Sequence, residues 1–579
     1  MFAELIFYSF LAILSMIKSL FAFLIFCIIE GLLTFGGNMK KLFSLLFSVS
    51  FFILSTNTYA GSHSHPVTGE KLAADQTFTY WHGDEHSSHD PQILEDTYGS
   101  NIARDLFEGL LNQDADGNLI PGVAETWSAN DSKDVYTFNL RKNAKWSNGD
   151  PITAHDFVYA WQRAVDPATA SPYSWFMEIM SIKNGGEVIS GDVPPSDLGV
   201  KALDDYTFQV ELTASLPYFA AMTTHATTFP THKATIEAHG SDWTKPENMV
   251  SNGAYMLTEH VINERLVRER NPMYWDNDNT ILEKVVVLVI PDENQGLTRY
   301  LAGELDQGPV PAGQYKKLKA EYPEQATSFP RLCNYYYTFN LSETGIEAFQ
   351  DVRVRKAMAY AIDRNVITED ILQAGQTPAY TFTPGSTAGF DVPKVAFSKM
   401  TQAERDAMAV SLMEEAGYGK DNPLSFTMIY NTSESHKKIA TVMAQMWKQK
   451  LGINATMENT EWKTFLDIRG KQDFEIARGA WCGDYNEAST FLDLLTSPSG
   501  YNDGKYSNAS VDQLMTEAKT SSDSSKLYTT VERILAAEMP VIPIYHYAGV
   551  FMLNSQIKGW PYDNVEQNWY SRNFYKVAK

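Results

Sequence analysis

The sequence predicts an α/β protein with more than one domain, for three reasons. The chain has 579 residues, more than a single hydrophobic core usually organises. Short strand patterns alternate along it with amphipathic helix patterns. No tandem repeat, low-complexity linker or long charge run divides the chain. We therefore expect domains between which the chain crosses more than once.

The elements follow from local residue patterns. Strands are expected where β-branched and aromatic residues cluster, at 77–81, 136–140, 207–212, 285–290 and 425–429. Helices are expected where apolar residues recur at helical spacing, at 101–111, 352–362 and 437–448. A turn at 146–151 precedes another helix, which Thr153 and Asp156 open with a capping arrangement.

One stretch carries an unusual density of chemically active side chains. Residues 474–477 predict a strand, followed by a loop and then a helix near 489–492. Between Arg478 and Asp484 the loop holds a cation, an indole, a thiol and a carboxylate. Loops between rigid elements often hold ligand-contacting groups. An ordinary strand-to-helix turn, with Asp484 near a helix N-terminus, is the alternative.

Residues 39–60 predict a cleavable secretory signal. Lys40 and Lys41 form the charged start, 42–54 is apolar, and a small-x-small motif ends at Ala60. We expect cleavage there and export to the periplasm.

Residues 1–38 form an upstream apolar extension. A transmembrane helix around 20–33 is one interpretation, but Lys18 and Glu30 interrupt it. Because two export signals in series are unusual, we favour Met39 as the true start.

The three cysteines fit an exported protein. Cys27 lacks the small residues that precede a lipid-anchored cysteine, so no lipid anchor is expected. Removal of the signal leaves Cys333 and Cys482, which predict a disulfide in an oxidising compartment. Two buried free thiols are the alternative.

Composition and motifs argue against several functions. The net charge of −23 disfavours nucleic acid and anionic membranes as partners. His82, Glu85 and His86 match a zinc-peptidase signature, but Gly83 breaks the helix on which both imidazoles would have to lie. We interpret this segment as a solvated loop. Further histidines lie close by: His63, His65 and His89.

This surplus of histidines favours adventitious metal binding over a catalytic metal, and we expect no metal and no cofactor. A nucleophilic Cys482 would need a free thiol and a partner histidine. The chain also lacks a G-x-S-x-G elbow. We expect a protein that is not an enzyme.

Several runs carry a more specific signal: 122–127, 140–149, 153–161, 251–255, 351–357, 430–433, 461–467 and the stretch around Trp481. These runs resemble the peptide-binding (family 5) extracellular solute-binding proteins of ABC transporters, and the resemblance covers essentially all of 70–579. It implies a two-lobed periplasmic-binding-protein fold with three domains around a hinge-closed cleft. Domain I would comprise 61–108, 233–332 and 549–579, domain II 109–232, and domain III 333–548.

The resemblance also implies a function. The protein would capture short peptides in an extended conformation and deliver them, as a monomer, to the membrane permease subunits of an ABC importer. Murein-tripeptide, dipeptide, metal and haem receptors of the same family are the alternatives. A lysine that serves the shortest peptides in one relative is replaced here by Leu372, which predicts weak dipeptide binding.

A peptide buried whole needs partners for its ammonium, carboxylate and amide groups. The resemblance assigns the ammonium to Asp484. It assigns the carboxylate to three residues that serve different ligand lengths: Arg478, Arg469 and His436. Backbone pairing falls at 96–97 and 478–482. The other residues expected to line the site are Glu95, Thr97, Ala480, Cys482 and five aromatics: Tyr173, Trp462, Trp481, Tyr336 and Tyr485. For each aromatic, plain core packing is the alternative.

Overall fold

The computed structural model describes residues 64–521 and 523–579. The expected signal, the upstream extension and Cys27 lie outside these residues. The chain divides into two units, Met1–Gly69 and Glu70–Lys579. Of the first unit only 64–69 is described, a turn in which the Gly69 N–H donates to the His65 carbonyl. Within the described ranges no helix is long and apolar enough to cross a membrane.

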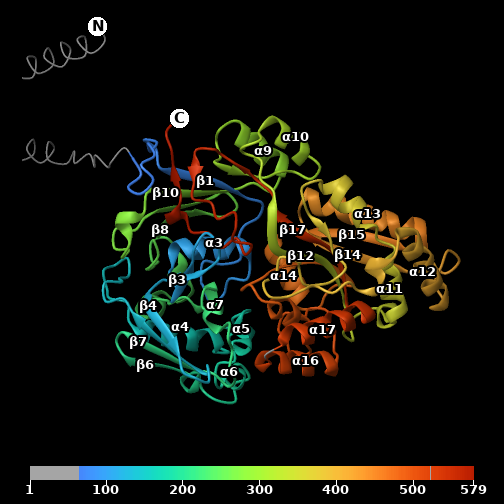
Figure 1. Cartoon of the computed structure of the whole chain (residues 1–579), viewed down its shortest axis with the longest axis horizontal. Coiled ribbons are helices and arrows are strands. Elements are labelled where there is room, and N and C mark those ends of the chain that lie inside the picture. Colours follow the sequence, from blue (N-terminus) through green and yellow to red (C-terminus); the bar gives the residue numbers. More distant parts are fainter. Residues whose placement is uncertain (1–63, 522) are drawn as a thin grey trace, which may run out of the picture. The chain divides into compact units, whose positions relative to one another are not determined.

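A six-stranded mixed sheet is assembled around β1, in the order β18-β11-β1-β10-β9-β8 (Figure 1). Its strands are β1 Thr77–His82, β8 Tyr255–Val261, β9 Arg265–Arg270, β10 Lys284–Val289, β11 Gln307–Gly308 and β18 Met552–Leu553. The nearby helices are α3 Thr97–Leu106, α8 Lys233–His239, α9 Glu293–Leu301 and α10 Tyr315–Glu321. β1 buries Phe78 and Tyr80 on one face, as its alternating pattern predicts.

A four-stranded antiparallel sheet follows the order β4-β5-β7-β6. Its strands are β4 Ala124–Ala129, β5 Val135–Leu140, β6 Val200–Asp204 and β7 Thr207–Glu211. Helix α4, Ala154–Val165, packs on β6 and β7 and begins with the expected Thr153/Asp156 capping box. Three short helices lie in the same part of the chain: α5 Ser174–Ile179, α6 Gly185–Ile189 and α7 Phe219–Met222.

The second six-stranded sheet has the order β13-β17-β12-β16-β14-β15. Its strands are β12 Phe329–Phe339, β13 Thr377–Pro378, β14 Ser425–Asn431, β15 Asn454–Thr460, β16 Ile476–Cys482 and β17 Val541–Gly549. Its helices are α11 Val352–Tyr360, α12 Gln402–Glu415, α13 Glu434–Leu451, α14 Trp462–Gly470, α15 Ser489–Leu492, α16 Ala509–Thr520 and α17 Ser524–Glu538. Two-stranded pairs complete the strands: β2 Leu111–Gln113 with β3 Leu119–Pro121, and β19 Ile557–Lys558 with β20 Tyr575–Lys576.

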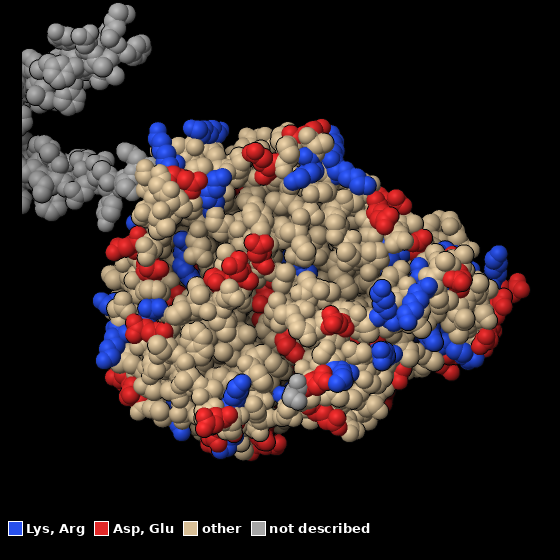
Figure 2. Space-filling view, viewed as in Figure 1, with Lys and Arg blue, Asp and Glu red and all other residues tan. Residues whose placement is uncertain are grey.

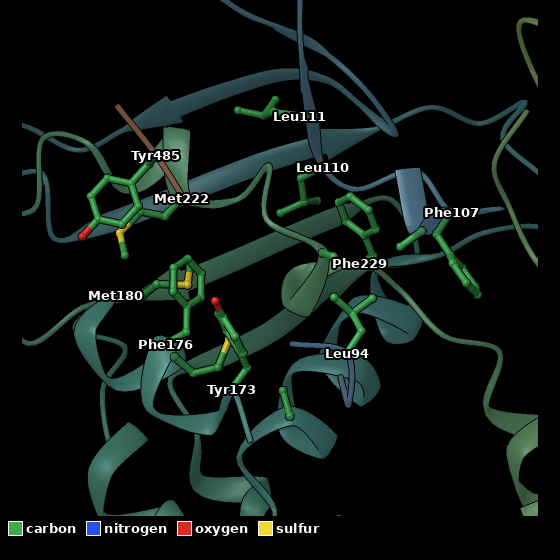
Figure 3. Close-up of a cluster of buried hydrophobic side chains, with 14 of the residues drawn as sticks. Leu94, Phe107, Leu110, Leu111, Tyr173, Phe176, Met180, Met222, Phe229 and Tyr485 are labelled. Atoms are coloured by element: carbon green, nitrogen blue, oxygen red, sulfur yellow. The ribbon is translucent and has the colours of Figure 1, made fainter. Parts of the chain in front are cut away.

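The sheets draw their strands from the segments expected for three domains, except that β12 and β17 extend slightly beyond 333–548. The domain boundaries themselves stay a prediction. On the face shown in Figure 2, basic and acidic side chains are interspersed. A large buried cluster brings aromatic and aliphatic side chains together, including Tyr173, Phe176, Met222 and Tyr485 (Figure 3).

Two differences between the expected elements and the structure affect residues near the candidate site. The helix expected at 101–111 is α3, which begins four residues earlier because Asp96 caps it by accepting from the Gly99 N–H, and which ends at Leu106. The loop expected after residue 477 is strand through Cys482, since seven consecutive residue pairs join β16 to β12. The second difference comes from pairing with a strand that is distant in the sequence, whereas the cap at Asp96 is a local contact that the apolar periodicity of 101–111 did not include.

Candidate functional site

A cavity of about 330 Å³ lies between the elements of the two six-stranded sheets. One wall comes from the loop after β1 and the start of α3, and the other from β14, α14 and β16. The expected residues that line it are Glu95, Thr97, Tyr173, His436, Trp462, Arg469, Arg478, Ala480, Trp481, Cys482 and Asp484. A second cavity, of about 310 Å³, shares Arg331, His436 and Tyr547 with the first, and Leu372 lines it. The two cavities therefore adjoin.

Strand β16 presents an unpaired edge to this space. Its parallel neighbour β14 pairs with it only at Ile476 and Ala477. On the opposite edge, the Gly483 N–H donates to the Leu332 carbonyl. Because successive residues of a strand direct their backbone groups to alternate edges, those of Ala480 and Cys482 point to the cavity side. Both residues line the cavity, so an extended chain could pair with them there.

A disulfide fixes the end of this strand. Cys333 and Cys482 lie opposite each other on β12 and β16 and are bonded, which confirms the expected bridge. Cys482 therefore has no free thiol to act as a nucleophile. Nearby, a Cβ at Gly479 would lie 2.5 Å from the Tyr336 ring, so only glycine allows the strand to pack this closely on β12.

Asp484 is a buried carboxyl group with no lysine or arginine at ion-pair distance among the described residues. Its Oδ1 lies 3.4 Å from Nε2 of His225, and its Oδ2 is buried and makes no hydrogen bond in the described structure. Burial raises the pKa of Asp484 well above its usual value, although Arg104 opposes this effect. Burial, with Arg104, also lowers the pKa of His225 to about 3, so this imidazole is uncharged at neutral pH. An ammonium group would supply the missing charge.

Arg478 is the complementary case, a buried cation held only by uncharged groups. Its Nη2 donates to the Tyr547 hydroxyl at 2.8 Å, and its guanidinium lies 4.8 Å from the Tyr335 ring centroid. Its Nε is buried without a hydrogen bond. Among the residues described, no carboxylate oxygen lies within 4.0 Å of its nitrogens. The site thus offers a positive charge to an incoming anion.

The other two expected carboxylate partners differ from Arg478. Arg469 forms an ion pair with Asp503, so its charge is already compensated. Burial, reinforced by Arg478, holds the pKa of His436 well below its usual value. His436 can therefore supply a hydrogen bond at neutral pH but no charge.

Several cavity residues were not anticipated from the sequence. Arg331, on β12, lines both cavities and has a buried Nε without a hydrogen bond. Tyr501 donates a 2.7 Å hydrogen bond to Glu95. Other polar groups on the wall that were not anticipated are Asp84, His225, Asn431 and Tyr547. No local motif marks Arg331, because only the packing of β12 brings it to the cavity.

A matching family model defines the relationship of this chain to known proteins. The model for "Bacterial extracellular solute-binding proteins, family 5 Middle" matches residues 118–503. The chain belongs to this family.

Individual relatives agree with the family. The periplasmic oligopeptide-binding protein OppA of Salmonella typhimurium is 43% identical over 514 residues, which cover 88% of this chain and 94% of OppA. Two solved structures each match 88% of this chain, and each match covers the whole of the solved chain. The Escherichia coli murein tripeptide binding protein MppA gives a TM-score of 0.86 at 43% identity. Haemophilus influenzae OppA, in complex with RPPGFSPFR, gives a TM-score of 0.85 at 40% identity. These matches establish the two-lobed fold.

The arrangement of this family member resembles one form of MppA more than another. The unliganded open form of MppA gives a TM-score of only 0.64, against 0.86 for the other MppA structure. The chain is thus structurally less similar to the unliganded open form than to the other MppA structure. Our structure therefore differs from the open arrangement.

Two expected site residues do not line the cavity. The Tyr336 ring packs against Phe382 in the core, 4.9 Å between centroids. Tyr485 stacks on Tyr218 and lies with Met222 in the buried cluster of Figure 3. By contrast, Tyr173 and Trp481 lie nearly parallel on the cavity wall, 6.3 Å apart. The alternative of core packing holds for the first two aromatics.

The segment expected to be a solvated loop is largely buried, and that expectation was wrong. His82, His86 and His89 are 2%, 7% and 7% exposed. His82 stacks on Tyr98 at 4.1 Å. His82 and His86 do not share a helix, so the zinc-peptidase arrangement is not formed by them.

Proposed function

We propose that this chain is a periplasmic receptor that binds short peptides in an extended conformation. The observation that carries this proposal is the pair of uncompensated groups, Asp484 and Arg478, separated by the free edge of β16. A zwitterion satisfies both charges, and its amide groups pair with Ala480 and Cys482.

The positions of these groups support one direction and a limited length for the ligand. Asp484 lies six positions after Arg478, two positions beyond the end of β16, and six residues of fully extended chain would span at most roughly 20 Å at about 3.3 Å per residue. Both side chains reach into this distance, which leaves room for about three to five ligand residues. The ligand amino end lies at Asp484, so the peptide runs antiparallel to β16. Glu95, Thr97, Tyr173, Trp462 and Trp481 then surround its side chains.

The receptor passes its peptide to the permease subunits of an ABC importer. It reaches the periplasm through the signal at 39–60 and acts there as a soluble monomer, without catalysis and without a nucleic-acid partner. The periplasmic relatives support this localisation. Three domains, with the boundaries given above, form its two lobes.

Calorimetry with modified peptides tests this function. Lys-Ala-Lys should bind, and both N-acetylation and C-amidation should weaken binding because each removes one ligand charge. Equal binding of the acetylated peptide would remove Asp484 from the proposed role. Stronger binding of a murein tripeptide would instead assign the receptor to cell-wall peptide recycling, which the similarity to MppA also permits.

A further inference from the structure

Three imidazoles converge outside the two cavities. His86 and His89 follow β1, and His260 lies on β8; each offers one ring nitrogen, and these nitrogens lie within 4.8 Å of one another. The ring centroid of His89 lies 4.4 Å from the ring centroid of His86 and 4.6 Å from that of His260. None of the three lines either cavity. The cluster is therefore separate from the proposed peptide site.

Glu85 adds a carboxylate to this cluster. Its Oε1 lies 2.8 Å from Nδ1 of His86 and 3.1 Å from Nε2 of His260. In a tetrahedral site with metal–ligand distances of about 2.0–2.1 Å, neighbouring ligand atoms are separated by about 3.3 Å. Two of the contacts are thus already close to that separation. Small rotations of the imidazoles would bring the His89 nitrogen to the same separation from the other ligand atoms.

His89 supplies an independent indication of a missing ligand. Its Nε2 is buried and makes no hydrogen bond to the described atoms. The backbone of Thr244 hydrogen bonds to the same ring. A metal-binding histidine typically donates its other ring N–H in this way, which fixes the ring orientation. Because buried polar nitrogens are normally satisfied, the free Nε2 indicates a partner that the polypeptide does not supply.

We propose that Glu85, His86, His89 and His260 bind a divalent first-row transition ion, with Zn²⁺ as the natural occupant. Three imidazole nitrogens and one carboxylate oxygen match the ligand preference and the coordination number of Zn²⁺. All four ligands come from the protein, as in a structural zinc site. The ion would join the loop after β1 to the β8–β9 hairpin, to which Glu85 is already held by the Asn263 N–H at 2.6 Å.

Cobalt substitution tests the site directly. The untagged full chain would be treated with EDTA, dialysed and titrated with Co²⁺. We expect one equivalent to produce the intense visible absorption of a four-coordinate ion, and Zn²⁺ to abolish it by displacement. His89→Leu and His260→Gln should each weaken Co²⁺ binding at least about 100-fold, since even second-shell changes weaken metal sites 10–100-fold.

Two controls separate this site from other histidines. His155→Gln alters an exposed histidine whose nearest carboxylate, Asp205, is 3.6 Å away, and it should leave the spectrum unchanged. A His63→Ala/His65→Ala variant should also retain the absorption. The proposal fails if no four-coordinate spectrum forms, if the spectrum survives in both cluster variants, or if the N-terminal pair abolishes it. Circular dichroism establishes whether each variant is folded. If His89→Leu does not fold, His260→Gln still tests the proposal.

Discussion

Substitution of Asp484 by asparagine should separate ligand binding from stability. Asparagine keeps the shape of the side chain but cannot carry the negative charge that a ligand ammonium needs. Removing one partner of a buried ion pair costs about 3–5 kcal/mol. At 1.4 kcal/mol per tenfold change, Kd for Lys-Ala-Lys should rise between about 100-fold and about 4,000-fold. The unliganded protein should lose about 1 kcal/mol of stability at most, because no described cation pairs with the carboxyl group.

Calorimetry and denaturant unfolding together measure these two effects. Asp473→Asn is the matched control, since Asp473 is exposed and does not line the cavity. A double-mutant cycle with N-acetylated Lys-Ala-Lys isolates the charge contact, because this peptide has no ammonium at its N-terminus. Asp484→Asn should scarcely affect the acetylated peptide. An affinity loss below tenfold, or equal losses for both peptides, would refute the pairing.

Three further predictions follow from the site. Arg478→Met should weaken binding of free peptides more than Arg469→Met, because Asp503 already pairs with Arg469; equal losses in calorimetry would contradict this order. Peptide binding should release a proton at a pH near the raised pKa of Asp484: burial raises this pKa in the empty site, the ligand ammonium lowers it again, and affinity therefore falls as the pH drops through the raised pKa. Calorimetry in buffers of different ionisation enthalpy measures this release, which should disappear in Asp484→Asn. Reduction of the Cys333–Cys482 bridge, which spans 149 residues, should lower the free energy of unfolding by about 2–5 kcal/mol, and unchanged denaturant midpoints would exclude that contribution.

Much of the fold could be predicted from periodicity and capping. The Thr153/Asp156 box and the strand around Phe78 depend on neighbouring residues, so local reasoning located them. The strand beyond Ala477 could not be located in this way, because Arg478 and Gly479 are poor strand signals. Pairing with β12, distant in the sequence, decides their conformation.

The sequence predicted which residues line the site better than it predicted which of them carry an uncompensated charge. Motif resemblance named Asp484 and Arg478, and both line one cavity. It could not show that Asp503 neutralises Arg469 or that burial keeps His436 uncharged, because both effects arise from three-dimensional neighbours. Arg331 was missed for the same reason.

Asp484 and Arg478 lack oppositely charged partners in the described structure. This has a consequence for how an importer distinguishes a receptor with bound peptide from an empty one. If the lobes close over an empty site, Arg478 is buried unpaired at a cost of several kcal/mol, because it cannot become neutral by losing a proton, whereas Asp484 can become neutral by gaining one. A bias of about 3 kcal/mol keeps the closed form below about 1% of the empty population. A bound ligand supplies the missing charges and removes the energetic cost of closing, so the closed conformation indicates that a ligand is bound. A permease that recognises only the closed shape would then avoid transport cycles without cargo.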